Sequence, residues 1–204
     1  MSKIQSKGYN FIAPFYDDGV GLLFGKGIFD AQIHFLSKIP ARSQVLILGG
    51  GSGWLLVELF KQVSEAHVCY IDASEKMIEL AKEKTNERVE FICGTEKDIP
   101  NRKFDFIITN FYLDGFSYPT LIQTIQHIAQ FLNENGKWIA TDFVVTGKKK
   151  HAIILWATHL FFRILVKHPN KRLVDWQKAF NKAEFKQEEI ASFNQGFILT
   201  VIYS

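Results

Sequence analysis

The chain has 204 residues, of which 47% are hydrophobic and 22% charged, a composition typical of a globular protein and not of a disordered one. Its net charge of +3, from 24 basic and 21 acidic side chains, is too small by itself to indicate a nucleic-acid partner. The N-terminus lacks a signal-peptide pattern, no stretch of roughly 20 apolar residues could span a membrane, and Cys69 and Cys93 are the only cysteines, so we expect a cytoplasmic protein.

The first 40 residues have the pattern of a helical, aromatic cap, in which Phe29, Ile33 and Leu36 share one helical face. From residue 44 onward, strand and helix patterns alternate. The expected strands are 44–49, 66–72, 88–93, 104–109 and 137–143, and the expected helices are 53–62, 74–84 and 118–132. This order predicts a Rossmann-like α/β fold with a mostly parallel sheet and helices on both faces.

The C-terminal third departs from this alternation. A long helix at about 150–166 and a second at 173–183 precede two strands, 185–193 and 197–203, joined by a tight turn at Asn194, Gln195 and Gly196. We therefore expect a seven-stranded sheet with an antiparallel C-terminal strand. Since no linker is visible, one domain should cover 1–204, with a cap at 1–40, a cofactor-binding core at 44–143, and an inserted helix and C-terminal strand pair at 144–204.

A glycine-rich turn follows the first predicted strand, and an acidic residue ends the second. Gly49, Gly51 and Gly53 let backbone N–H groups approach a ligand without an intervening side chain. Asp72, at the tip of the next strand, can accept both hydroxyls of a ribose. Together they predict a βαβ unit that binds an adenosine-type ligand.

Further motifs narrow the ligand. Asp72, Ala73 and Ser74 are followed by Met77, where Ser74 has the pattern of a helix N-cap. With residues 45–53, 91–100, 104–113 and 133–143, this segment resembles the class I S-adenosylmethionine-dependent methyltransferases, in order and at that family's spacing. Residues 16–18 are also similar to the start of quinone-biosynthesis methyltransferases. The resemblance implies S-adenosylmethionine as the cofactor.

The resemblance also implies a role for each matching residue. The glycines would approach the methionine part and the ribose, Asp72 would hold the ribose hydroxyls, and the remaining residues would lie at the adenine or the sulfonium. The implied cofactor-binding set is Gly49, Gly50, Gly51, Gly53, Asp72, Ala73, Met77, Gly94, Thr95, Asn110, Phe111 and, from the cap, Tyr16. The chain departs from the family at Ile47, where many relatives carry an acid that orders the glycine loop, and at Thr95, where Asp is frequent.

Two carboxylates are candidates for chemistry. Asp114 follows the fourth predicted strand, and Asp142 ends the fifth, so both lie at the sheet edge where ligands bind. Each could act as a general base or anchor the acceptor. The alternatives are a loop residue for Asp114 and a cap or turn role for Asp142.

The helix at 150–166 carries more apolar surface than a solvated helix requires, between basic clusters at 148–150 and 167–172. It could form the wall of an acceptor pocket, a homodimer interface or a peripheral membrane contact. No carboxylate cluster suggests a metal site, and no nucleic-acid module is visible. These features favour methyl transfer to a small, hydrophobic acceptor. A non-catalytic binder of the cofactor and an aminopropyltransferase of the spermidine synthase type are the alternatives.

Overall fold

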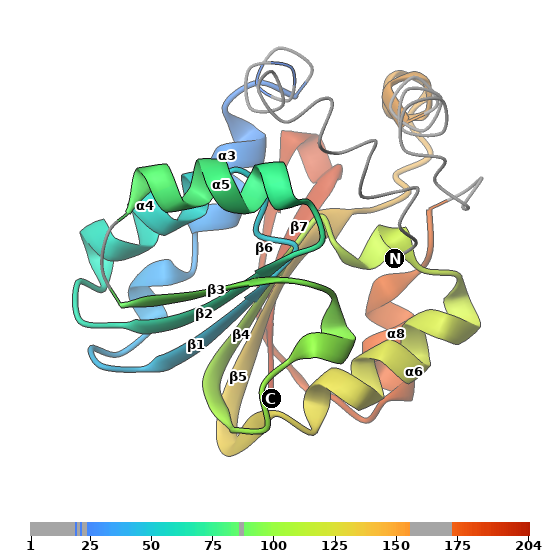
Figure 1. The fold of residues 1–204 in the computed structure, drawn as a ribbon. Helices are drawn as coiled ribbons and strands as arrows, with labels where there is room; N and C mark the ends of the chain where they lie inside the picture. The colour runs from blue at the N-terminus through green and yellow to red at the C-terminus, as the bar shows by residue number, and fades with distance from the viewer. Residues whose placement is uncertain (1–18, 20, 22–23, 86–87, 156–172) are drawn as a thin grey trace.

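A computed structural model of the chain describes residues 19, 21, 24–85, 88–155 and 173–204. Seven strands form one sheet in the order β3-β2-β1-β4-β5-β7-β6 (Figure 1). The strands in chain order are β1 (Gln44–Leu48), β2 (His67–Asp72), β3 (Val89–Cys93), β4 (Phe104–Asn110), β5 (Leu132–Phe143), β6 (Gln187–Phe193) and β7 (Ile198–Tyr203). Strands β1 to β5 pair in parallel, and β7 runs antiparallel to both β5 and β6. The predicted sheet, with its antiparallel C-terminal strand, is confirmed.

Helices cover both faces of the sheet. They are α3 (Gly27–Ile33), α4 (Trp54–Gln62), α5 (Glu75–Lys84), α6 (Tyr118–Ala129) and α8 (Trp176–Lys182). Short 3₁₀ turns lie between them at η2 (Leu36–Lys38), η3 (Glu96–Asp98), η4 (Leu113–Gly115) and η5 (Asn194–Gly196). Figure 1 shows α3, α4 and α5 on one side of the sheet and α6 with α8 on the other. The result is a three-layer α/β domain.

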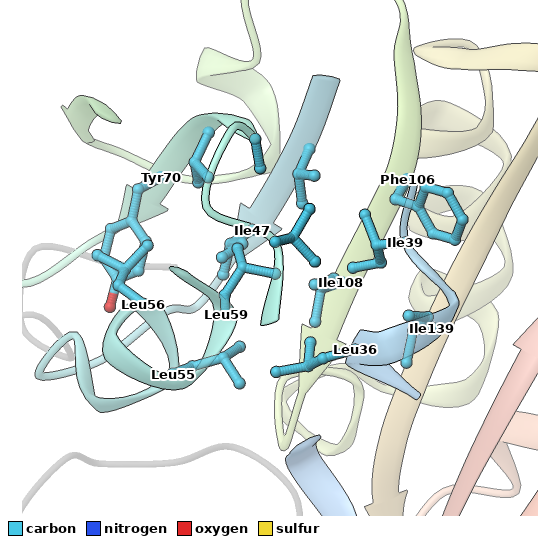
Figure 2. Packing of buried hydrophobic residues seen from close by; sticks show 14 of the residues in the cluster. Leu36, Ile39, Ile47, Leu55, Leu56, Leu59, Tyr70, Phe106, Ile108 and Ile139 are labelled. Carbon is cyan, nitrogen blue, oxygen red and sulfur yellow. The ribbon is translucent and has the colours of Figure 1, made fainter. Parts of the chain in front are cut away.

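One face of the sheet packs under α4 and α5. Alternate strand residues such as Ile47, Tyr70 and Ile108 meet Leu56 and Leu59 of α4, as Figure 2 shows. All five side chains are at most 1% exposed. Because strand side chains alternate between faces, this single set of strand positions forms one continuous apolar layer.

The opposite face packs under α6 and α8. Trp138 of β5 lies between these helices and the sheet, and its ring nitrogen donates to the Thr109 hydroxyl at 2.9 Å. The rings of Phe180 and Tyr203 stack with centroids 4.1 Å apart. A buried indole N–H needs such a partner, so Trp138 keeps its packing without an unsatisfied donor.

The predicted helix at 118–132 is too long in the C-terminal direction. The helix α6 ends at Ala129, and Leu132 already pairs with Phe104 as the first residue of β5. The pairing register shifts before Lys137, which lies opposite Phe106. Leu132 fits the helical spacing of apolar residues, but its backbone pairs with the sheet instead. The strand β5 therefore starts before the predicted residue 137 and includes Asn135 and Gly136, where the sequence predicts a turn.

The C-terminal elements agree with expectation in type and differ in extent. The helix α8 spans seven residues, fewer than the predicted 173–183. The turn at η5 has positive φ at Asn194, Gln195 and Gly196, which reverses the chain between two antiparallel strands. The inserted helix begins at residue 149 and is described to residue 155; its predicted remainder lies outside the described residues. Within the segments that the structure describes, no helix has the length and apolar character needed to cross a membrane.

Candidate functional site

The glycine loop leaves β1 at its carboxyl end and turns into α4. Gly49, Gly51 and Gly53 have φ values of 66°, 68° and 83°, in the left-handed region that favours glycine. A Cβ on Gly53 would lie 2.6 Å from the Cα of Ala81, so α4 and α5 approach too closely for a side chain. A Cβ on Gly51 would meet no described atom within 4 Å. The loop is therefore closely packed at its end, Gly53, and has unfilled space at its centre, Gly51.

The N-terminus of α4 has no side-chain cap. Its N-cap is Gly53, which has no side-chain acceptor. The first N–H groups of a helix without such a cap remain available to a ligand, and the helix dipole favours a negative one. The loop and helix end can therefore hold an anionic group, such as a carboxylate.

Asp72 ends β2 and connects the loop to the next helix. Its two carboxylate oxygens accept one backbone N–H each, from Gly51 at 2.9 Å and from Ser74 at 2.9 Å. Burial raises the pKa of Asp72, and these two N–H donors act in the opposite direction. The side chain is thus held in one orientation, with lone pairs left for further donors.

The next helix starts as the sequence predicts. Ser74 is the N-cap of α5, and its hydroxyl accepts the N–H of Met77 at 3.2 Å. Met77 is buried, and Ala73 lies between Asp72 and the cap. Ala73 therefore adjoins Asp72 at the end of β2, and Met77 lies in the first turn of α5.

Gly94 and Thr95 follow β3 and lie beside β2. The N–H of Gly94 donates to the backbone oxygen of Asp72 at 2.9 Å. Thr95 caps η3 together with Asp98, whose carboxylate accepts the Thr95 N–H at 2.8 Å. The structure therefore brings Gly94 next to Asp72, while the Thr95 hydroxyl is engaged in the cap.

Tyr112 and Glu96 form a contact that the sequence did not predict. The Tyr112 hydroxyl donates to the Glu96 carboxylate at 2.8 Å, and a Cβ on Gly49 would lie 2.6 Å from the Tyr112 ring. Burial and the adjacent carboxylate raise the pKa of Tyr112 well above its usual value, so the hydroxyl stays protonated. An acid followed by an aromatic 16 residues later carries no recognisable pattern, so the sequence offers little signal for this bridge.

Asn110 is the last residue of β4 and lies beside the glycine loop. The preceding residue, Thr109, pairs with Leu48, directly before Gly49. Both side-chain polar atoms of Asn110 are buried, with no hydrogen-bond partner among the described residues. An unsatisfied buried amide costs about 1–3 kcal/mol, so a ligand at this position would relieve a penalty.

Phe111 follows Asn110 with a φ of 51°, an uncommon value for a side chain of this size. Its N–H donates to the backbone oxygen of Thr141 at 2.8 Å, and its ring lies 4.8 Å from that of Phe143. Strained backbone of this kind concentrates at functional sites. Here it directs an aromatic ring toward the end of β5.

Asp114 and Asp142 lie together at the carboxyl edge of the sheet. Asp142 accepts backbone N–H groups from Leu113 at 3.1 Å, from Asp114 at 3.2 Å and from Phe143 at 2.8 Å. Asp142 therefore has the cap role that the sequence offered as an alternative. Burial raises the pKa of Asp114 to about 7, while burial and the neighbouring Asp114 carboxyl raise that of Asp142 well above its usual range. A base with a pKa near 7 suits proton abstraction.

Two further sequence predictions concern Ile47 and Tyr16. Ile47 is 1% exposed and packs in the apolar layer under α4, so no charged group could replace it there without a partner. Tyr16 lies outside the described residues. The structure thus brings together ten of the twelve predicted cofactor residues around the ends of β1, β2, β3 and β4: Gly49, Gly50, Gly51, Gly53, Asp72, Ala73, Gly94, Thr95, Asn110 and Phe111. Met77 lies in the first turn of α5.

Comparison with known proteins agrees with this fold. Residues 45–136 match the family model described as a methyltransferase domain. A solved complex between the Haloferax volcanii Trm112 methyltransferase activator and a methyltransferase contains a similar chain, with 16% identity, a TM-score of 0.75 and 96% of each chain covered. The chain thus has the fold of that solved structure, and residues 45–136 are similar to a methyltransferase domain.

Two curated relatives are similar over the same region. A malonyl-[acyl-carrier protein] O-methyltransferase of Priestia megaterium is 35% identical over 101 residues, which cover 48% of this chain and 36% of the relative. A polyamine aminopropyltransferase 2 of Bacillus cereus is 28% identical over 128 residues, covering 54% and 35%. The match therefore spans about one third of each relative.

The loop geometry predicts opposite results for two glycine substitutions. Gly53→Ala should destabilise the fold by about 2–4 kcal/mol, because it combines left-handed backbone strain with a clash against α5. Gly51→Ala should cost only the strain, about 1–2 kcal/mol, but it should remove cofactor binding because its methyl group would fill the open centre of the loop. Urea unfolding and calorimetry measure the two effects. Equal stability losses would contradict this reading of the loop.

Proposed function

We propose that the protein is an enzyme that transfers a methyl group from S-adenosylmethionine to a small, hydrophobic acceptor. The observation that carries the proposal is Asp72, whose carboxylate is held by Gly51 on one side and Ser74 on the other. This arrangement joins the glycine loop to the start of α5 and presents lone pairs where the two hydroxyls of a ribose could donate.

The residues around Asp72 fit the rest of the cofactor. The open centre of the loop at Gly51 and the uncapped start of α4 leave room and N–H donors for its methionine part. The buried amide of Asn110 could donate to or accept from polar groups of the same part. Gly94 lies beside Asp72, where an adenine would extend. Such a ligand requires hydrogen-bond partners and space. The Asn110 amide and the unfilled centre of the loop at Gly51 could supply them at the same edge of the sheet.

The chain's own contribution to catalysis is orientation and proton removal. Bound S-adenosylmethionine would supply a methyl group activated by its sulfonium. Holding an acceptor atom in line with that group can provide much of the acceleration. Asp114, with a pKa of about 7, is placed to take a proton from an acceptor that must lose one, and Asp142 fixes the backbone that carries it.

Aromatic side chains next to these carboxylates favour a hydrophobic acceptor. Phe143 contacts the rings of Phe111, Phe24 and Phe197, at centroid distances of 4.8 Å, 5.0 Å and 5.0 Å. The inserted helix adds His151, which stacks on Phe197 at 4.6 Å. Because these contacts hold the described start of that helix against the ends of β5 and β7, we propose that the helix forms a wall of the acceptor pocket.

An aminopropyltransferase is the second candidate, favoured by the Bacillus cereus relative. That family carries an acidic residue directly after the triple glycine. Here the position holds Ser52, which is buried and whose hydroxyl accepts from the Lys84 ammonium at 3.2 Å. A neutral side chain engaged with a lysine does not supply the missing acid, so we favour methyl transfer.

Calorimetry tests the proposal directly. S-adenosylmethionine and its demethylated product should bind, and NAD should not. Formation of the demethylated product with a panel of phenolic and quinol acceptors separates an enzyme from a non-catalytic binder. Turnover of decarboxylated S-adenosylmethionine with putrescine would favour the second candidate. Failure of both adenosyl ligands to bind would overturn the proposal.

A further inference from the structure

We propose that Tyr70 is the positioning residue that orders the glycine loop for the cofactor, in place of the acid that relatives carry at the position of Ile47. The assignment rests on the proposed cofactor. It goes beyond that proposal because Tyr70 lies outside the predicted set of binding residues, in the middle of the buried strand β2.

The first observation is that Ile47 and Tyr70 are register partners. The two residues lie opposite each other on the adjacent parallel strands β1 and β2, and both side chains point into the same apolar layer (Figure 2). Ile47 offers no hydrogen bond to the loop. A long side chain on the neighbouring strand can reach the loop from the same face of the sheet.

The second observation is the reach of that side chain. The Tyr70 hydroxyl donates to the backbone oxygen of Gly51 at 2.9 Å. Asp72, two residues later on the same face of β2, accepts the N–H of Gly51 at 2.9 Å. Gly51 is thus held at its donor by one side chain and at its acceptor by the other.

The third observation explains why position 50 holds glycine. A Cβ on Gly50 would lie 2.1 Å from the Tyr70 ring, so the ring occupies the space that any side chain at this position would need. The ring of Phe91 meets that of Tyr70 edge-on at 5.5 Å and supports it from β3. Gly50 and Tyr70 therefore act as one unit, since the glycine admits the ring and the ring brings the hydroxyl to Gly51.

The two hydrogen bonds to the backbone of Gly51 matter because a glycine backbone is conformationally flexible. Gly51 has a φ of 68°, and with no side chain its flanking peptides can rotate at little cost. A loop that must become ordered on binding loses affinity, and a loop already ordered does not. Holding both backbone groups of Gly51 preorganises the surface that faces the cofactor.

Tyr70→Phe isolates the hydroxyl because it keeps the ring. Wild-type protein and the variant are titrated with the demethylated cofactor product by calorimetry, and their thermal melts are recorded without ligand. We expect binding about 5–10-fold weaker in the variant, from the loss of one buried hydrogen bond and of loop order. Tyr203→Phe is the matched control, since the Tyr203 hydroxyl is buried without a partner among the described residues and lies on the opposite face of the sheet. Its affinity should equal that of the wild type.

Hydrogen exchange gives a readout that does not depend on ligand. Peptides covering residues 49–53 should exchange faster in Tyr70→Phe and at the wild-type rate in Tyr203→Phe. Gly50→Ala should displace the ring at position 70 and weaken binding with either Tyr or Phe there, because the added Cβ clashes with ring carbons that both residues have. Wild-type affinity and wild-type exchange in Tyr70→Phe would overturn the assignment. If the wild-type protein itself does not bind the demethylated product, the result contradicts the proposed function and not the role of Tyr70.

Discussion

Asp72→Ala should weaken the binding of S-adenosylmethionine by about 100-fold or more while the sheet remains folded. Each hydrogen bond to a charged group contributes about 1.5–3 kcal/mol, and the substitution removes both expected bonds to the ribose hydroxyls. It also releases Gly51 and Ser74, so the loop and the start of α5 lose an anchor at the same time. Calorimetry measures the affinity, and circular dichroism reports the fold.

Asp105→Ala is a matched control for Asp72→Ala. The Asp105 carboxylate also holds two donors, the N–H of Gln44 at 2.8 Å and the side chain of Asn133 at 2.6 Å. It lies near the start of β4, at the edge of the sheet opposite the site. The control should lower the melting temperature by a similar amount and keep its affinity. Unchanged affinity in Asp72→Ala would show that the ribose lies elsewhere.

Asp114→Asn should lower the rate of methyl transfer to an ionisable acceptor by about 10²–10⁴-fold, the usual contribution of a general base. Cofactor affinity should stay within about twofold of the wild type. Since the pKa of Asp114 is about 7, the wild-type rate should rise as pH increases through that value and then level off. Initial rates measured from pH 5.5 to pH 8.5 test this profile, and a flat profile would contradict it.

The same carboxyl should influence stability with a definite sign. Its pKa is about 7 in the folded protein and near 3.8 when unfolded, so between these values the folded state binds the extra proton. Stability therefore falls as pH rises from about 4 to about 7, and the slope disappears above the folded pKa. Asp114→Asn should flatten this part of the profile, measured by urea unfolding at each pH. If the variant kept the full wild-type dependence of stability on pH, a group other than Asp114 would bind the extra proton in the folded state.

Local chemistry made much of the cofactor region predictable. The apolar strand before Gly49 and the Ser74 N-cap were both confirmed at their predicted positions. Each depends on neighbours within a few residues, because strand alternation and helix capping are short-range properties. The ends of the parallel strands then follow from the topology, which explains why the residues implied by the family resemblance gather at one edge.

Contacts between distant residues were not predictable in the same way. The Tyr112–Glu96 bridge joins residues 16 apart, and the Tyr70–Gly51 bond joins residues 19 apart. Neither pair has a periodic or motif-like spacing, because each contact depends on how two separate strands lie beside each other in the sheet. The early end of α6 has a similar origin, since Leu132 satisfies helical periodicity but gains a β4 partner.

The sequence by itself determined the α/β class, the order of the elements and the edge of the sheet where the residues implied by the family resemblance gather. Those properties arise from periodicity, turn chemistry and the fixed direction of parallel strands. Only the tertiary structure decided how the glycine loop is held, because a missing acid at Ile47 and a tyrosine on the next strand become related only when β1 and β2 pair. It also decided that Asp142 caps η4, while Asp114 beside it has the raised pKa that suits a base. Burial sets the pKa of Asp114, and the pairing of distant segments sets the hydrogen bonds of Asp142, so both are properties of the folded chain.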